Sequence, residues 1–326
     1  MRLLPVSLAI LALTAGTSRA VTLFPGDIVV VDRGTQTAAN GQLIRVDPVT
    51  GVQTVISSGG ILVDSTGVTL DANGDLLVAD NNSGNLPPAT GSIITVDPVT
   101  GAQAIFSERS AYADPFGIVL DSAGDILITD TQAPSGGGIF RVDPVTAIET
   151  VVSGGGSLVG PRGFAIDASG DLLVADTTGS VIRVDPVSGL QTIVSSGGSF
   201  QVPEGLAIDA AGDIFIADSS ASAIFRVNPI TGGQTTVSSG GSFVRPVGLA
   251  IDANGDLIVV DDAALGGAGG VIRVDPVTGF QTTVSSLGNF LNPAGVMIVP
   301  IPDPSTALLL GFGLTALVAA RRRMLL

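Results

Sequence analysis

Residues 203–218 read PEGLAIDAAGDIFIAD and residues 246–261 read PVGLAIDANGDLIVVD, so one pattern occurs twice, 43 residues apart. Within it, an Asp-x-x-Gly-Asp segment leads into a short apolar run that ends in Asp. This block has five complete copies, at residues 71–80, 121–130, 167–176, 209–218 and 252–261, and a shortened copy at residues 26–32. Because self-similarity at a nearly fixed period is the signature of a repeat architecture, this block decides the fold.

A second block, VDPVTG at residues 46–51, also recurs. Its six copies or close variants start at residues 46, 96, 142, 184, 227 and 274, which are 50, 46, 42, 43 and 47 residues apart. This period suits a four-stranded propeller blade. In the fifth unit we expect strands at residues 205–209, 213–218, 223–228 and 234–238. The Asp-x-x-Gly-Asp and Asp-Pro-x-Thr-Gly segments are expected to form the tight turns between them.

The first unit lacks its leading strand, and one strand is left over after the sixth unit. Residues Pro293-Ala-Gly295 match Pro203-Glu-Gly205, the start of a leading strand. We therefore predict that residues 295–299 complete the first blade beside residues 26–32, which closes the ring and removes its open edge. The predicted fold class is all-β, a six-bladed β-propeller of four-stranded blades over residues 21–300.

Composition excludes several kinds of chemistry. The formal net charge is −15, and all fourteen basic residues are Arg. An acidic surface repels phosphate backbones, so we expect no nucleic-acid partner. The chain has no Cys and no His, which excludes disulfides, thiolate chemistry, a His-based triad and the usual zinc sites.

The first twenty residues, MRLLPVSLAILALTAGTSRA, have the pattern of a secretory signal peptide. Arg2 precedes an apolar stretch that ends at Leu13, and small residues stand at Ser18 and Ala20. We expect an N-terminal signal helix at residues 1–20, cleaved after Ala20, and hence an exported protein. A buried first helix is the alternative.

The other end, residues 301–326, contains three features in order. Pro302-Asp303-Pro304 leads into an apolar run at residues 307–320, followed by Arg321, Arg322 and Arg323. The run is short for a membrane span, and the arginines after it are expected to stay cytoplasmic. We therefore expect a C-terminal transmembrane helix that leaves the propeller outside.

This three-part tail resembles the PEP-CTERM sorting tail of Gram-negative bacteria, with Asp303 where that family has Glu. The resemblance implies two partners, the export machinery and an exosortase-like enzyme that processes the tail. It also implies localisation at the cell envelope or surface, or release from the cell after processing. An ordinary C-terminal anchor without cleavage is the alternative.

The repeat P-x-G-[LFI]-A-[IV]-D-x-x-G-D resembles the NHL-repeat and gluconolactonase-like propeller families over residues 26–299. The resemblance implies the fold. It does not imply one activity, because propellers of this architecture include lactonases, lyases and binding platforms.

Strand directions alternate within a blade, so the connections fall on two faces. The short first–second and third–fourth turns share one face, the turn face. The longer second–third and fourth–first connections share the other, the variable face, where we expect function because variable loops on a rigid frame commonly carry it. The candidate ligand-binding residues in or beside the fourth–first loops are Glu108, Arg109, Tyr112, Asp114, Arg162, Glu204 and Arg245.

An Asp ends the second strand of every blade, namely Asp32, Asp80, Asp130, Asp176, Asp218 and Asp261. Carboxylate oxygens bind hard cations, so a Ca²⁺ ion is the cofactor that this ring of acids suggests. The alternative is that each Asp accepts hydrogen bonds from loop amides. Recurrence in all six blades favours that alternative, because a functional set is usually asymmetric.

We therefore expect an exported, surface-sorted propeller that acts as a binding or scaffolding module, with an extracellular polysaccharide or a protein as partner. The alternative is a divalent-metal-dependent hydrolase or lactonase of the gluconolactonase-like type. That resemblance implies a metal held by Glu, Asn and Asp, whereas this chain has only Glu108, Glu149 and Glu204. A virginiamycin-lyase-like activity would require a catalytic His, which the chain lacks. The non-enzymatic class is favoured.

Overall fold

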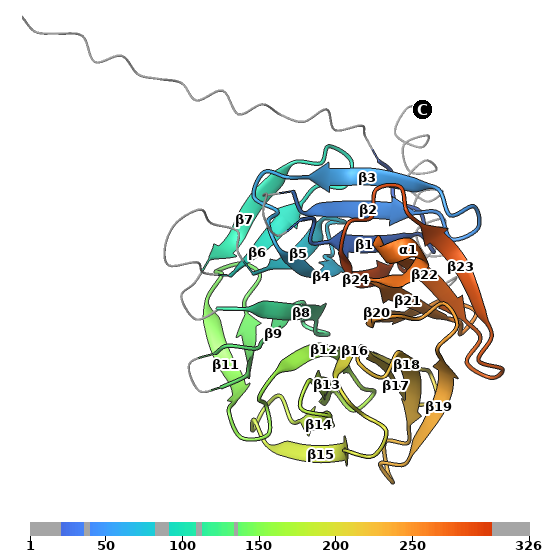
Figure 1. Cartoon of the computed structure of the whole chain (residues 1–326). Helices are drawn as coiled ribbons and strands as arrows, with labels where there is room; N and C mark the ends of the chain where they lie inside the picture. The colour runs from blue at the N-terminus through green and yellow to red at the C-terminus, as the bar shows by residue number, and fades with distance from the viewer. Residues whose placement is uncertain (1–20, 36–39, 82–90, 109–112, 134–135, 302–326) are drawn as a thin grey trace, which may run out of the picture.

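Six four-stranded antiparallel sheets stand around a common axis in the computed structural model (Figure 1). It describes residues 21–35, 40–81, 91–108, 113–133 and 136–301. We call the sheets blades A to F in chain order. The first strand of each blade contacts the first strands of both neighbouring blades and so lies at the axis.

The four strands of every blade follow one another from the axis outward. Blade A contains β24 (Pro293–Ile298), β1 (Ile28–Asp32), β2 (Gln42–Val46) and β3 (Gln53–Ser58). Blade B contains β4 (Ser65–Leu70), β5 (Leu76–Asp80), β6 (Ser92–Val96) and β7 (Gln103–Glu108). Blade C contains β8 (Pro115–Leu120), β9 (Ile126–Asp130), β10 (Gly138–Val142) and β11 (Glu149–Gly154).

The remaining blades have the same order. Blade D contains β12 (Pro161–Ile166), β13 (Leu172–Asp176), β14 (Ser180–Val184) and β15 (Gln191–Ser196). Blade E contains β16 (Pro203–Ile208), β17 (Ile214–Asp218), β18 (Ala223–Val227) and β19 (Gln234–Ser239). Blade F contains β20 (Pro246–Ile251), β21 (Leu257–Asp261), β22 (Gly270–Val274) and β23 (Gln281–Ser286), with the short helix α1 (Ala264–Gly267) after β21.

The predicted ring closure is confirmed. β24 pairs antiparallel with β1, with Val30 opposite Val296. The amide of Gly26 donates to the carbonyl of Val299 at 2.9 Å, and the amide of Val299 donates to the carbonyl of Asp27 at 2.9 Å. The closing strand begins at Pro293 and ends at Ile298, slightly earlier than the sequence indicated.

The two expected terminal helices cannot be compared with the structure. The signal helix at residues 1–20 and the tail from Pro302 onward lie outside the described residues. Within the described ranges, no helix has the length and apolar character that crossing a membrane requires.

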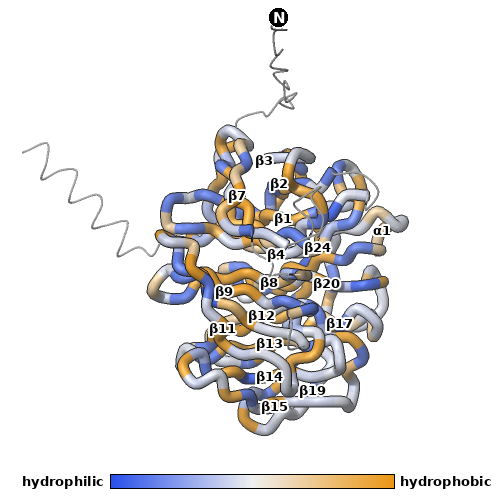
Figure 2. The backbone as a smooth tube through the Cα atoms, turned by 90° about the vertical axis from the view of Figure 1, so that its left-hand side faces the viewer, coloured by the Kyte–Doolittle hydropathy of each residue, from blue (hydrophilic) through white to orange (hydrophobic). Residues whose placement is uncertain are grey.

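The hydrophobic core forms layers between neighbouring blades. One cluster joins Val30 and Ile44 of blade A to Ile258 and Val260 of blade F, all fully or almost fully buried. The second strand of each blade is apolar because neighbouring blades cover both of its faces. Figure 2 shows the hydrophobic segments along the strands and many hydrophilic segments in the connections at the edges.

A ring of glycines controls how closely the inner strands approach one another. A Cβ atom added to Gly205 would lie 2.8 Å from the carbonyl oxygen of Val247 in the next blade, and one added to Gly295 would lie 2.3 Å from that of Thr66. Real Cβ atoms essentially never come this close to another heavy atom. The same approach occurs in every blade, at Gly67, Gly117, Gly163, Gly205, Gly248 and Gly295. This set, the glycine ring, allows six backbones to meet around one narrow axis.

The predicted turns are confirmed. In blade B, Asp71 Oδ1 accepts hydrogen bonds from the amides of Asn73 and Asp75 at 2.8 Å, and Gly74 has φ +90°. In blade A, Asp47 Oδ1 accepts from the amides of Val49 and Thr50 at 3.0 and 2.8 Å. These amide hydrogen bonds lower the pKa of Asp47. Both turns are therefore held by an Asp side chain that bonds its own backbone.

A second repeated contact, which we call the latch, joins the outer strands of adjacent blades. Gln191 of blade D donates through Nε2 to Ser153 Oγ and to the Gly155 carbonyl of blade C, both at 3.0 Å. Ser153 Oγ in turn donates to the Gly189 carbonyl at 2.8 Å. Equivalent latches centre on Gln53, Gln103, Gln234 and Gln281.

The junction between blades B and C departs from this pattern. Ala147 stands where blade D has Gly189 and keeps the left-handed backbone at φ +53°, which is strained for a residue with a Cβ atom. Glu149 stands where blade D has Gln191, and its side chain has no N–H to donate. Among the described residues, Ser107 Oγ at this junction is buried without a hydrogen-bond partner.

We predict that Ala147→Gly stabilises the protein. The change removes the left-handed strain, worth about 1 kcal/mol in the free energy of unfolding. In a domain of this size it should raise the melting temperature by roughly 2–4 °C. Gly189→Ala is the matched control and should lower the melting temperature, because its Cβ atom would lie 2.6 Å from the Val152 carbonyl oxygen. A lower melting temperature for Ala147→Gly would contradict the prediction.

Candidate functional site

The six inner strands enclose an axial channel with a cavity of about 250 Å³. Where the channel opens on the variable face, each blade contributes the residue that directly precedes its member of the glycine ring. These six residues, which we call the mouth ring, are Thr66, Phe116, Arg162, Glu204, Val247 and Ala294. Five of them are buried and line the cavity, and the half-buried Arg162 lies against Phe116 and Glu204. The structural positions are equivalent, but the six side chains all differ, so the mouth is asymmetric.

A further hollow of about 500 Å³ lies at the outer edge of blades D and E. Its lining includes Ser195 and Gln234, which belong to a latch. None of the described residues that line it has a charged side chain. The mouth is therefore the better candidate for a binding site.

A layer of polar residues surrounds the mouth ring in equivalent positions. In blade B, the amide of Asn81 donates to the Asp64 carbonyl at 3.1 Å, and in blade F the amide of Asp262 donates to the Arg245 carbonyl at 3.3 Å. In blade A the equivalent bond runs from Arg33 to Asn292 at 3.0 Å. These backbone hydrogen bonds therefore place the Cα atoms of the layer equivalently in each blade, whereas the side chains themselves differ from blade to blade.

The repeated Asp residues hold this frame together. Asp176 accepts hydrogen bonds from the amides of Val159 and Gly160 at 2.9 Å and of Thr178 at 3.0 Å. Equivalent carboxylates accept amides in the other five blades, at Asp32, Asp80, Asp130, Asp218 and Asp261. All six side chains are buried. Burial raises the pKa of the Asp32 and Asp130 carboxyls, although the amide hydrogen bonds oppose the shift.

These contacts are those expected if each Asp anchors a loop. Within the ranges that the structure describes, no three acidic side chains are grouped so that they could hold a metal ion. Binding of Ca²⁺ by the Asp ring therefore stays a prediction.

Two of the arginines at the mouth are paired by hydrogen bonds. Arg162 of blade D donates to Glu204 of blade E, whose other carboxylate oxygen accepts from Ser219 Oγ at 2.7 Å. Arg245 Nε donates to both oxygens of Asp262 at 2.8 and 2.9 Å. Burial raises the pKa of Asp262, whereas its bonds to Arg245 act in the opposite direction. Both pairs thus place donors and acceptors in fixed positions beside the channel.

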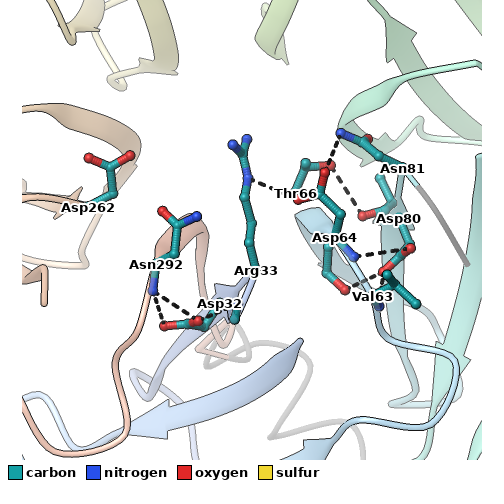
Figure 3. A network of polar contacts seen from close by, with 12 residues as sticks. Asp32, Arg33, Val63, Asp64, Thr66, Asp80, Asn81, Asp262 and Asn292 are labelled. Carbon is teal, nitrogen blue, oxygen red and sulfur yellow. Dashed lines mark hydrogen bonds and ion pairs between the residues drawn. The ribbon is translucent and has the colours of Figure 1, made fainter. Parts of the chain in front are cut away.

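The third arginine, Arg33, reaches the mouth from the end of β1. Its Nε lies 3.7 Å from Asp64 Oδ1, and its guanidinium carbon lies 5.2 Å from the centre of the Phe116 ring. Arg162 also stacks on Phe116, at 4.6 Å. Loss of water around the Arg33 side chain, which is 17% exposed, lowers its pKa. Figure 3 shows Arg33 between Asn292 and Asp262 on one side and Asp64 and Asn81 on the other.

The candidate ligand residues from the sequence fall into four groups. Arg162 and Glu204 belong to the mouth ring, and Asp114 and Arg245 lie in the layer around it. Glu108 is exposed at the end of β7, the outermost strand of blade B. Arg109 and Tyr112 lie outside the described residues.

Sequence reasoning missed Arg33, Phe116 and Asp262. Aligning the repeats on their Pro-x-Gly segment would have found Phe116, because it occupies the same position as Arg162 and Glu204. Aligning the Asp that ends each second strand would have found Arg33 and Asp262, each of which directly follows such an Asp. These three residues could have been recognised from their positions within the repeat, and not from a search for charged residues in loops.

Comparison with known proteins supports the fold. No protein-family model and no curated protein matches the chain. The structure is similar to a solved structure of a nidogen/laminin complex, with a TM-score of 0.68 and 17% identity over 84% of this chain and 98% of that chain. It is also similar to virginiamycin B lyase from Staphylococcus aureus, with a TM-score of 0.54 and 14% identity over 71% and 73% of the two chains. At these identities the similarities show the propeller fold and no specific function.

Proposed function

We propose that this protein is an exported binding module that holds a polar ligand at the channel mouth on the variable face. The observation that carries the proposal is the asymmetry of the mouth ring. The blades repeat their turns, anchoring Asp residues and glycine ring, yet each blade carries a different side chain in the mouth ring. A frame that served only to build the ring would not require this difference.

The arrangement of the mouth also suits binding. Arg162 and Glu204 belong to adjacent blades and are held by one another, by Phe116 and by Ser219. Side chains that are already ordered lose little conformational entropy when a ligand binds, so more of the contact energy contributes to affinity. Arginine supplies donors and the acids supply acceptors, which together match a ligand rich in polar groups.

The hydrolase or lactonase alternative has no specific observation in its favour. We therefore propose the binding function alone.

We predict that a double variant, Arg162→Gln with Glu204→Gln, loses ligand binding at least tenfold while it stays folded. Replacing both partners by neutral side chains of similar size avoids leaving one buried charge unpaired. The full chain is first screened against glycans and lactones, in Ca²⁺ and in EDTA, and the binders are then measured by calorimetry with the variant.

The matched control is Arg183→Gln with Asp167→Asn, which removes an ion pair on the turn face. This control should bind like the wild type. Equal binding by all three proteins would place the ligand site elsewhere and contradict the proposal. Turnover of a lactone that EDTA abolishes would favour the hydrolase.

We also propose that the tail sorts the protein to the cell surface, where an exosortase-like enzyme recognises Pro302-Asp303-Pro304. The direction of β24 supports one orientation. This strand runs from Pro293 near the mouth to the turn face, where Val299 is hydrogen-bonded to Gly26 and Asp27. A tail anchored in a membrane would therefore hold the turn face towards the membrane and the mouth away from it.

Single cysteines test this orientation, because the chain has none of its own. Val244→Cys lies in a loop of the variable face, and Val187→Cys lies in a turn of the turn face, where the native side chains are 52% and 94% exposed. In intact cells, a bulky membrane-impermeant maleimide should label residue 244 faster than residue 187. Removal of residues 302–326 should release the protein from the envelope. In the released protein the maleimide should label residue 187 faster than residue 244, because residue 187 is more exposed. A tail-deleted protein that stays equally bound to the envelope would contradict the tail interpretation.

A further inference from the structure

We infer that the ligand at the mouth is a sugar acid whose carboxylate binds the guanidinium of Arg33. This inference rests on the proposed function, since it names the ligand class of the same site. Three observations lead to it: the incomplete pairing of Arg33, the way its side chain is held, and the polar groups beside it.

Arg33 differs from the other two arginines of the mouth in its partners. Arg162 and Arg245 both donate hydrogen bonds to carboxylates. Within the described residues, the carboxylate that contacts the Arg33 side chain is Asp64, at 3.7 Å, and no hydrogen bond joins the two. The Nε atoms of Arg33 and Arg162 are both buried without a hydrogen-bond partner, so the difference between them is the hydrogen bond to a carboxylate that Arg162 makes and Arg33 lacks. Hydrogen bonds to charged groups are stronger than those between neutral groups. A ligand carboxylate on the terminal nitrogens would give Arg33 the charged acceptor that Arg162 and Arg245 already have.

The Arg33 side chain is also held ready for such a group. Its guanidinium stacks on Phe116, a residue of blade C, although Arg33 itself belongs to blade A. Figure 3 shows its terminal nitrogens pointing into the space between Asp262 and Asn81. A planar guanidinium presents two parallel N–H groups, which match the two oxygens of one carboxylate.

The charge balance limits the ligand to few negative groups. Arg33, Arg162 and Arg245 face Asp64, Glu204 and Asp262, and Asp114 in the surrounding layer adds a fourth acid, so acids outnumber these arginines at the mouth. A ligand with several acidic groups close together would be repelled by these acids. One carboxylate per sugar ring fits Arg33, which makes no hydrogen bond to a carboxylate within the described residues.

The groups beside Arg33 favour hydroxyls on the rest of the ligand. Asp64 and Asn292, both partly exposed, lie on opposite sides of the Arg33 side chain (Figure 3). A carboxylate accepts hydrogen bonds, and an amide both accepts and donates, so both can bond sugar hydroxyls. A purely apolar acid would cover these groups and leave them without partners. A hexuronate carries the required carboxylate and hydroxyls on one ring.

The test is calorimetry on the full chain with glucuronate, with neutral glucose and with an oligomer of hexuronate. We expect wild type to bind glucuronate at least about tenfold more tightly than glucose, because charge-assisted hydrogen bonds to Arg33 are lost with the neutral sugar. Arg33→Gln should weaken glucuronate binding by at least about tenfold. The glucuronate affinity of Arg33→Lys should lie between those of the wild type and Arg33→Gln, because lysine keeps the charge and loses the planar pair of donors.

The matched control is Arg183→Gln, whose arginine is ion-paired on the turn face. It should bind glucuronate like the wild type. If Arg33→Gln does not fold, the comparison of Arg33→Lys with the wild type decides. Equal affinity for glucuronate and glucose, or unchanged glucuronate binding in the Arg33 variants, overturns the inference.

The source of the sugar acid follows from the same measurements. Tighter binding of the oligomer than of glucuronate identifies an acidic polysaccharide, and equal binding identifies the free acid; both support the inference. A different outcome separates the two proposals: glucuronate does not bind, but another screened ligand does, and the Arg162→Gln, Glu204→Gln variant no longer binds that ligand. In that case the inference fails and the proposed function stands. If no ligand depends on the mouth, both fail.

Discussion

The contact between each inner-strand glycine and a carbonyl of the next blade is the constraint on which the rest of the structure depends. Side chains at these six positions would collide with neighbouring backbone, as the 2.3 Å approach at Gly295 shows. Because the backbones meet so closely, the residue before each glycine is brought to the edge of one narrow channel. The contact that closes the ring therefore also gathers the mouth residues, and fold and candidate site have the same physical origin.

The remaining repeated contacts keep this arrangement in register. Buried Asp residues such as Asp176 fix the loops that lead into the inner strands, and the latches join the outer strands of adjacent blades. The junction between blades B and C, with strained Ala147 and unpartnered Ser107 Oγ within the described residues, is the exception. The contacts that recur from blade to blade, namely the Asp anchors and the latches, thus stabilise the ring. We assign ligand binding to the mouth positions, where the side chains differ from blade to blade.

Most of the fold could be predicted from the sequence, because each blade repeats its turn residues and the leftover Pro293-Ala-Gly295 segment identifies the closing strand. The site could be predicted only in part. Arg162 and Glu204 were found because they are charged residues in or beside the fourth–first loops. The stacking of Arg33 on Phe116 joins blade A to blade C, which is not its neighbour in the ring, and only the dimensions of the closed ring determine such a contact.

The most direct test of the central claim is a crystal structure of the full chain with the tightest ligand from the binding screen. The account predicts that this ligand lies over the channel on the variable face and contacts the mouth ring and Arg33. A ligand bound only on the turn face, or only in the hollow at the outer edge of blades D and E, would contradict it.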